Sequence, residues 1–126
     1  MFQNPTSSGT APSAAKWPPA EKAYAGAPSL VSESKWIAET AANWEDELNR
    51  EWYLRHAALL DRIALDIAHL DNQPGATRAA EEADATAVLL LDLDQAPRDY
   101  DPRAYVRQQY ALWHAQQNPS TEPSDT

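Results

Sequence analysis

Cysteine is absent from the 126-residue chain, and glycine, methionine and phenylalanine are scarce, at three, one and one residues. Without a thiol, the chain can form no disulfide, zinc–thiolate site, iron–sulfur cluster or cysteine nucleophile. Three glycines leave no glycine-rich loop that could cradle a phosphate, and the sequence has no Walker-type, HExxH, Rossmann or nucleophile-elbow motif. The common enzyme signatures are therefore missing from the sequence.

Basic residues are also few, because 10 lysines and arginines stand against 19 aspartates and glutamates. The formal net charge of -9 argues against binding nucleic acid through its phosphates. No apolar run approaches the roughly 18 residues that span a membrane, and the N-terminal segment lacks the basic and apolar regions of a secretory signal. We therefore expect a cytoplasmic protein with no cofactor, no membrane partner and no direct binding to nucleic acid.

Residues 1–31 contain five of the ten prolines and two of the three glycines, and they show no helical or strand period. Such a segment buries too little apolar surface to offset the entropy that is lost on ordering. We predict a disordered arm over residues 1–31 and, on the same grounds, a disordered polar tail over residues 118–126. The alternative for the arm is a short docking motif centred on Trp17 and Tyr24.

The strongest helical pattern covers residues 32–71, which contain neither proline nor glycine. Ser32 is the expected N-cap, with Ser29 as a competing cap, and the residues from Asp71 to Gly75 end the helix. Apolar residues recur at steps of three and four, and a second, narrower apolar strip runs along the C-terminal half. This half is therefore predicted to lie between two partners and not on a single surface.

A second helix is predicted over residues 76–96, where alanine and leucine repeat at helical spacing. Thr77 is its expected cap, and Pro97 ends it because the residue before proline is disfavoured in a helix. Its last part, VLLLDLD at 88–94, also has the composition of a short buried strand. We favour the helix, because the sequence contains no other strand candidate to pair with this one.

A third helix is predicted over residues 101–117, and its start is well specified. Asp101 is a good N-cap, and Pro102 occupies the first helical position, where a missing N–H costs nothing. Tyr100 and Tyr105 have the spacing of a hydrophobic staple across this N-terminus. Local interactions alone are therefore expected to set the first residue of this helix and the direction of the chain before it.

The predicted fold is all-α, a helical hairpin or three-helix unit over residues 32–117 that is built on one long amphipathic helix. A helix of about 40 residues would be about 60 Å long, since each residue adds about 1.5 Å. The two shorter helices cannot cover that length. Either the long helix breaks near Asn49 and Arg50, or it projects and pairs with a second copy of the chain as a homodimer.

Three tryptophans at intervals of eight residues lie on the predicted long helix, either in the core of a small domain or on a binding surface. A helix that its own chain cannot cover leaves apolar residues available to a partner. We therefore predict an interface, which would also serve the homodimer, made of Trp36, Trp44, Trp52, Leu54, Leu60, Ile63 and Ile67.

Two short patterns contain acidic residues that could bind a metal ion. Four apolar residues followed by Asp92-x-Asp94 resemble the first motif of the haloacid dehalogenase-type phosphotransferases. The resemblance implies that Asp92 attacks phosphorus and Asp94 handles a proton beside Mg²⁺ at the end of a strand, although no lysine follows Asp94 as that family requires. Asp66-x-x-His69 is similar to half of a carboxylate-bridged two-metal site, of which the sequence holds one copy only.

These observations favour a non-enzymatic protein–protein interaction module, such as an accessory or regulatory subunit, whose protein partner is unknown. One alternative is an acidic inhibitor or decoy that binds a basic, nucleic-acid-binding surface. The other is a metal-dependent, phosphotransferase-like enzyme that uses residues 88–94. Salt distinguishes the first two hypotheses, because electrostatic binding weakens steeply with ionic strength and apolar packing does not.

Overall fold

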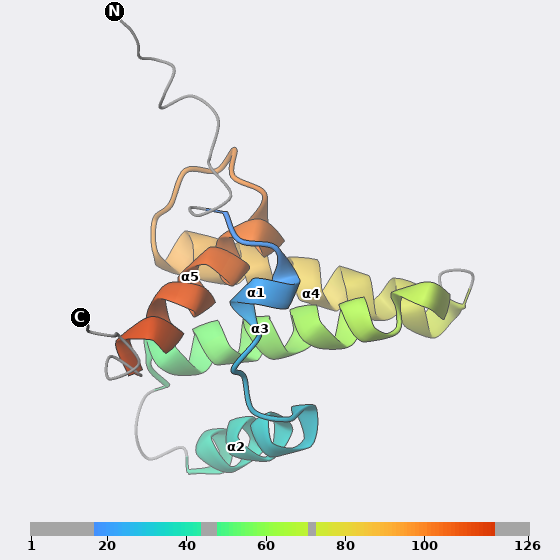
Figure 1. The fold of residues 1–126 in the computed structure, drawn as a ribbon, viewed down its shortest axis with the longest axis horizontal. Coiled ribbons are helices and arrows are strands. Elements are labelled where there is room, and N and C mark those ends of the chain that lie inside the picture. Colours follow the sequence, from blue (N-terminus) through green and yellow to red (C-terminus); the bar gives the residue numbers. More distant parts are fainter. Residues whose placement is uncertain (1–16, 44–47, 71–72, 118–126) are drawn as a thin grey trace, which may run out of the picture.

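The computed structural model describes residues 17–43, 48–70 and 73–117 (Figure 1). No strand occurs in these ranges, so the all-α class that the sequence predicts is confirmed. In chain order the elements are α1 (Ala20–Ala23), α2 (Leu30–Ala42), α3 (Arg50–Asp66), the 3-10 turn η1 (Ala68–Leu70), α4 (Pro74–Leu93) and α5 (Pro102–Gln117).

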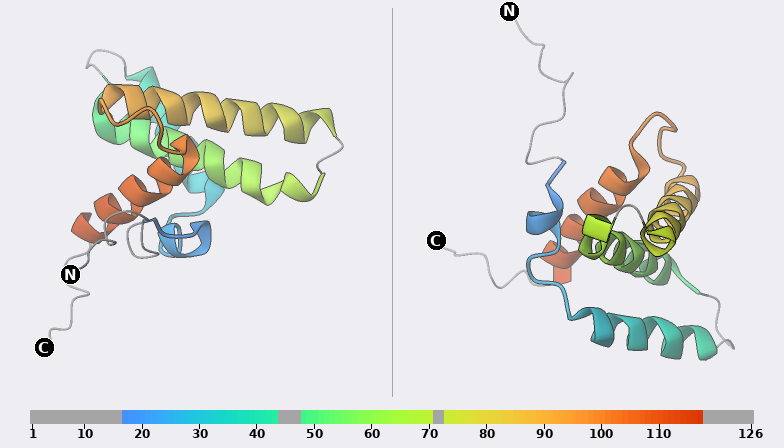
Figure 2. Two further views of the ribbon diagram at one scale, coloured as in Figure 1. Left: turned by 90° about the horizontal axis from the view of Figure 1, so that it is seen from above. Right: turned by 90° about the vertical axis from the view of Figure 1, so that its right-hand side faces the viewer.

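The α3–α4 hairpin is the central element, since the two helices run antiparallel and side by side along most of their length (Figure 2). Near the loop that joins them, the hairpin extends beyond α1, α2 and α5 (Figures 1 and 2). We call this part, residues 63–70 and 73–83, the projecting end. Small side chains let two helices pack closely, and the buried alanines of the two helices are Ala57, Ala58, Ala64, Ala76, Ala83 and Ala87.

The main core lies at the opposite end of the hairpin, where α5 packs against both α3 and α4. Tyr105, Val106 and Tyr110 bring the apolar face of α5 into this core, and all three are buried. Trp17 and Tyr24 pack against the same cluster from the N-terminal segment. The buried cluster consists of Leu54, Ala57, Ala58, Ala87, Leu90, Leu91, Tyr105, Val106 and Tyr110.

The single helix predicted over residues 32–71 is wrong, because the chain forms two helices there. α2 ends at Ala42, and the N–H of Asn43 bonds back to the carbonyls of the last turn. α3 begins at Arg50, where the side chain of Asn49 accepts a hydrogen bond of 3.1 Å from the N–H of Trp52. The alternative that we considered, a break near Asn49 and Arg50, is confirmed.

α2 folds back beside α3, and three contacts show the antiparallel pairing. The Nε1–H of Trp52 donates to the carbonyl oxygen of Ile37 at 3.1 Å, and the guanidinium of Arg55 lies 3.6 Å from the centre of the Trp36 ring. Nearer the start of α2, Arg62 donates to the carbonyl of Pro28 at 2.7 Å. The chain therefore covers one side of α3 with its own α2, and the length argument for a homodimer no longer holds.

The disordered arm predicted over residues 1–31 is wrong for residues 17–31, which are ordered and packed. The rings of Trp17 and Tyr100 meet edge to face at 5.0 Å, and those of Tyr24 and Tyr110 at 5.3 Å. Ala23 in α1 is buried. The predictions for residues 1–16 and for the tail at 118–126 lie outside the described residues.

Ser29, the competing cap, begins α2 in place of Ser32. The hydroxyl oxygen of Ser29 accepts a hydrogen bond of 3.1 Å from the N–H of Ser32, so the helix starts at Leu30. Glu33 then lies in the first turn, where a carboxylate is favoured by the helix dipole. Glu33 also lies against α3, where it pairs with Arg55.

α4 spans Pro74–Leu93, so the helical interpretation of the VLLLDLD segment is confirmed for residues 88–93. The helix starts two residues earlier than predicted, with Pro74 in the first turn and Gln73 in place of Thr77 as the N-cap. It also ends three residues earlier, at Leu93, because the chain turns sharply there. Gln95 adopts a positive φ of 56°, and the N–H of Ala96 bonds to the carbonyl of Leu91 at 3.0 Å.

Replacing Gln95 by glycine is expected to stabilise the fold by about 0.5–1 kcal/mol. Gln95 occupies the left-handed position of a Schellman turn, where a side chain is strained and glycine is not. Urea denaturation followed by circular dichroism measures the change, with the exposed Gln116→Gly as the control at an ordinary helical position. A loss of stability in Gln95→Gly equal to that of the control would contradict the assigned turn.

The predicted start of α5 is confirmed by the local contacts. The carboxylate of Asp101 accepts a hydrogen bond of 3.1 Å from the N–H of Arg103, and Pro102 is the first helical residue. The rings of Tyr100 and Tyr105 lie 6.0 Å apart across this N-terminus, as expected of the staple. α5 is therefore held in register at the point where it meets the core.

Candidate functional site

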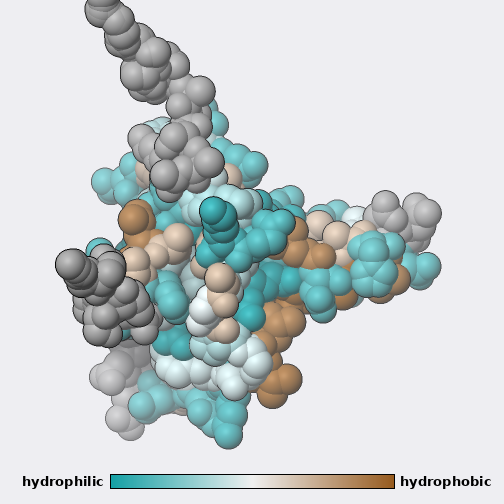
Figure 3. Space-filling model, viewed as in Figure 1, coloured by the Kyte–Doolittle hydropathy of each residue, from teal (hydrophilic) through white to brown (hydrophobic). Residues whose placement is uncertain are grey.

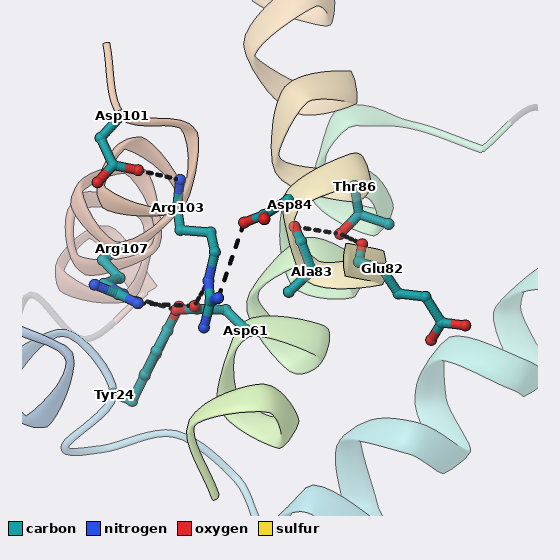
Figure 4. A network of polar contacts seen from close by, with 9 residues as sticks. All are labelled: Tyr24, Asp61, Glu82, Ala83, Asp84, Thr86, Asp101, Arg103 and Arg107. Atoms are coloured by element: carbon teal, nitrogen blue, oxygen red, sulfur yellow. Dashed lines mark hydrogen bonds and ion pairs between the residues drawn. The ribbon is translucent and has the colours of Figure 1, made fainter. Parts of the chain in front are cut away.

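Asp61 is completely buried on α3 and accepts hydrogen bonds from three side chains (Figure 4). The hydroxyl of Tyr24 donates at 2.6 Å, and the Nε of Arg103 donates at 2.6 Å. Arg107 donates twice, from Nε at 2.8 Å and from Nη2 at 2.9 Å. One carboxylate thus ties the N-terminal segment and α5 to the middle of α3, and we call this group the Asp61 clamp.

The ionisation of the Asp61 clamp is fixed at neutral pH. Burial acts to raise the pKa of Asp61, but the hydrogen bonds from Arg107, Tyr24 and Arg103 outweigh it and hold that pKa below its usual value. Burial, followed by the charge of Asp61, raises the pKa of Tyr24 well above its usual value. The carboxylate is therefore charged and the phenol neutral at pH 7, so the phenol donates and the carboxylate accepts in their hydrogen bond.

A second buried acid, Glu33, ties α2 to α3. Its two carboxylate oxygens accept from Nε and Nη2 of Arg55 at 2.7 and 2.8 Å, a bidentate pair. The third nitrogen of Arg55 donates to Glu51 at 2.8 Å, and its guanidinium lies 5.2 Å from the ring centre of Trp113 on α5. All three guanidinium nitrogens of Arg55 and both carboxylate oxygens of Glu33 are thus hydrogen-bonded within the fold.

The two aspartates of the phosphotransferase-like motif are both engaged with arginines. Asp94 accepts from Arg50 at 2.7 and 2.6 Å and from the hydroxyl of Tyr105 at 2.6 Å, and the hydrogen bonds from Arg50 are the main cause of its lowered pKa. Asp92 forms an ion pair with Arg98. The resemblance implies a strand before these residues, and that expectation is wrong because residues 88–93 belong to α4.

The pattern of Asp66 and His69 does not lie on one continuous helix. Asp66 is the last residue of α3, and His69 belongs to η1. In the part of the chain that the structure describes, no group of three or more histidine, aspartate, glutamate or cysteine side chains could hold a metal ion. His56 packs 4.7 Å from the Trp52 ring, and burial lowers its pKa.

The seven residues of the predicted interface have different environments. Leu54 is completely buried in the core, which corrects its assignment to an interface. Trp36 and Trp52 are partly buried where α2 packs on α3, and Trp44 lies outside the described residues. The remaining three are partly buried at spacings of three and four residues: Leu60 and Ile63 lie on one face of α3, and Ile67 is the residue that caps its C-terminal end.

Exposed apolar side chains gather on the α3–α4 hairpin, and Figure 3 shows several hydrophobic areas along this hairpin. Seven large apolar residues among those described are exposed, and five of them lie in α3, η1 or α4. The exposed fractions reach 50% at Leu89 and 49% at Leu93. The five hairpin residues are Leu65, Leu70, Val88, Leu89 and Leu93.

A groove of about 410 Å³ runs between α3 and α4 along the projecting end. Its acidic and basic lining residues are Glu81 and Asp84 from α4 and Arg103 from α5. The remaining lining is small or apolar and comes from both sides of the hairpin, at Ala64, Leu65, Ala68, Ala76, Thr77 and Ala80. We call this the alanine groove.

The chain matches no known protein family, no curated protein and no solved structure. Within the described ranges, each helix is too short or too polar to cross a membrane. The sequence predicts Leu60, Ile63 and Ile67 as interface residues, which stays a prediction, and it does not reveal the two buried acids or the exposed face of α4. Asp61 could have been found, because Leu54, Ala58 and Leu65 surround it in the second apolar strip of the helix.

Proposed function

We propose that the protein is a non-enzymatic interaction module that binds a protein partner through the α3–α4 hairpin. The observation that supports this proposal is the concentration of exposed large apolar side chains on the hairpin, five of the seven found among the described residues. Val88, Leu89 and Leu93 are neighbours on α4 at helical spacing, and exposed apolar side chains that gather in this way mark candidate binding surfaces. An accessory or regulatory subunit would use the hairpin in this way.

The architecture suits a docking role. The Glu33–Arg55 pair joins α3 to α2, and the Asp61 clamp joins α3 to α5. The Arg50–Asp94 pair joins the start of α3 to the end of α4. The hairpin is thus presented as a rigid element, and rigid elements lose little conformational entropy on binding. Covering the half-exposed side chains of Leu89 and Leu93 would contribute about 1 kcal/mol each to binding.

The double variant Leu89→Glu/Leu93→Glu is expected to lose its bound proteins without losing its fold. Both side chains are about half exposed, so charge is tolerated in the free protein but not in an apolar interface. The measurement is capture from an extract of the source cells, with quantitative mass spectrometry and circular dichroism of each variant. At least a tenfold loss of the captured partners is expected.

Leu112→Glu is the matched control for this experiment. Leu112 is 54% exposed, as Leu89 is 50% exposed, but it lies on α5 and not on the hairpin. The control should retain the partners that the wild-type chain captures. Equal capture by all three proteins, or loss in the control alone, would refute the hairpin as the docking surface.

A second copy of the chain is one partner that this proposal includes. A homodimer would now rest on Leu60, Ile63 and Ile67 together with the exposed face of α4, and no longer on an uncovered helix of about 60 Å. Light scattering over a tenfold dilution distinguishes the monomer, which has a mass of 14.0 kDa, from the homodimer, which has twice that mass. A dimer that the Leu89→Glu/Leu93→Glu variant dissociates would identify the partner as the chain itself.

An acidic decoy remains a second candidate function, and the composition of α4 favours it. This helix has four exposed acids, Glu81, Glu82, Asp84 and Asp92, against one exposed base, Arg78. Capture at 0.05 and 0.5 M salt separates the two functions. A decoy would lose its partners at high salt, whereas apolar docking on the hairpin would keep them.

A further inference from the structure

We propose that the alanine groove binds an amphipathic, basic helix of a partner protein, with one large apolar side chain in the groove and a lysine or arginine at its acidic edge. This inference rests on the proposed function, because it names the kind of partner that the hairpin would bind. Three features of the groove support it: its shape, its lining and its charge.

The shape of the groove follows from the small residues of the projecting end. Ala64 and Ala76 are buried at 5% and 8% exposure where α3 and α4 meet, and Ala68 and Ala80 flank them. Because no longer side chain fills the space beside these residues, a hollow of about 410 Å³ is left between the helices. That volume falls within the range of about 300–1,000 Å³ that is typical of binding sites.

The apolar lining is accessible from outside. Leu65 borders the groove and is 40% exposed, and Leu70 beyond the end of α3 is 43% exposed. α5 contributes Arg103 to the lining, and beyond this residue the hairpin extends past α1, α2 and α5, so the groove is open on the side of the joining loop (Figures 1 and 2). A cleft along two antiparallel helices fits a third helix, which is a recurring mode of peptide recognition.

The charge at the edge of the groove selects a basic partner. Glu81 makes no ion pair with any described residue, and the Asp84 side chain is 64% exposed, with its nearest cation, Arg103, at 3.9 Å. Asp61 is shared by Arg103, at 2.6 Å, and Arg107, so the two arginines are balanced by Asp61 and Asp84 together, and Glu81 is left as the unbalanced charge (Figure 4). The edge therefore keeps an excess of negative charge, and a cation beside the docked apolar group would complement it.

Two designed 18-residue peptides test this proposal directly. One has leucine on one helical face and lysine on the other, and the second has glutamate at each lysine position. Fluorescence anisotropy of labelled peptide, in 0.15 M salt, measures the affinity for the full chain. The lysine peptide should bind with a Kd below about 100 µM, and the glutamate peptide at least tenfold more weakly. Failure of the lysine peptide to bind, or equal binding of the two, would overturn the proposal.

Matched variants locate the binding site on the hairpin. Ala68→Trp fills the exposed side of the groove and should weaken the lysine peptide at least tenfold, whereas Ala85→Trp on exposed α4 outside the groove should not. Glu81→Lys should weaken it at least fivefold, and Glu82→Lys, an exposed neighbour outside the lining with the same change of charge, less than twofold. Equal effects within either pair would contradict binding in the groove.

The same variants separate this inference from the broader function. If cell-extract capture is lost in Leu89→Glu/Leu93→Glu but retained in Ala68→Trp and Glu81→Lys, the hairpin is a docking surface and the groove is not its site. If the lysine peptide binds in the groove while capture is unaffected by Leu89→Glu/Leu93→Glu, the groove is a binding site and the exposed face of α4 is not the docking surface.

Discussion

Replacing Asp61 by alanine is expected to lower the free energy of unfolding by about 3–5 kcal/mol. The substitution leaves Arg103 and Arg107 partly buried without their anion, and it leaves the buried phenol of Tyr24 without its acceptor. Removing one partner of a buried ion pair costs more than the pair itself contributes, because the remaining charge is left desolvated. Urea denaturation followed by circular dichroism measures the loss.

Asp66→Ala is the control for this prediction, since Asp66 is an exposed acid five residues further along α3. It should change the free energy of unfolding by less than about 0.5 kcal/mol. A loss below about 1 kcal/mol in Asp61→Ala would show that the buried contacts of the clamp contribute little to the fold.

The pH dependence of stability checks the same clamp. The pKa of Asp61 is lower in the folded chain than in the unfolded chain, so its contribution is fully present above the unfolded pKa of about 3.9. That contribution is lost as the pH falls through the lower, folded pKa. The wild-type chain should therefore lose more stability than Asp61→Ala on going from about pH 5 to pH 2. Parallel curves for the two proteins would contradict a charged Asp61.

Deleting residues 1–28 is expected to lower the melting temperature by about 10 °C or more. The deletion removes Trp17 from Tyr100, removes Tyr24 from Asp61 and Tyr110, and takes α1 away from α5. Burial of two aromatic side chains contributes several kcal/mol, and each kcal/mol is worth about 4–8 °C in a domain of this size. Differential scanning calorimetry measures the shift.

The shorter deletion of residues 1–16 is the matched control, because it keeps Trp17, α1 and Tyr24. The difference between the two deletions isolates residues 17–28. Composition alone predicts no difference, since the segment is rich in proline and poor in apolar residues. A melting temperature that is equal in both would favour that first prediction over the packed segment.

Local sequence patterns correctly predicted the features of the fold that depend on neighbouring residues. Asp101 and Pro102 set the start of α5, and the alanines before residues 88–93 favoured helix over strand there. The capping interactions join residues within one turn of the chain, so they form in the same way whatever the helix later packs against. The all-α class follows from the same kind of information.

The break between α2 and α3 was harder to predict, because neither proline nor glycine marks it. Asn43 and Asn49 carry the information, since asparagine is favoured at both ends of helices. The apolar residues keep a spacing of three and four residues across the segment between α2 and α3, so their pattern gives no sign of the break. The fold-back is favoured by the contacts of Glu33 and Trp36 with Arg55, which pair residues far apart in sequence.

The N-terminal segment shows why composition gave a wrong prediction. Residues 17–31 contain few apolar side chains, but Trp17 and Tyr24 are large and each meets a tyrosine that the rest of the chain provides. Tyr24 also supplies a donor that the buried Asp61 needs. A few well-matched contacts can therefore order a segment whose average composition resembles a disordered one.

The candidate surface was predicted only in part, because exposure depends on how helices pair. Apolar spacing singled out Leu60, Ile63 and Ile67, which are partly buried, together with Leu54, which is completely buried in the core. On α4 the alanines occupy the interface with α3, which leaves Leu89 and Leu93 on the outside. The spacing of apolar residues shows that a helix has an apolar face, whereas the other helices that pack against it determine which part of that face is covered.

Site-specific photo-crosslinking tests the central claim, docking through the hairpin, most directly. A photoreactive amino acid is placed at position 65 or 89 on the hairpin, or at position 112 on α5, which is at least as exposed, in the full chain inside its source cells. Crosslinked partner protein is expected from positions 65 and 89 and none from position 112. Crosslinks from position 112 alone, or from none of the three, would contradict it.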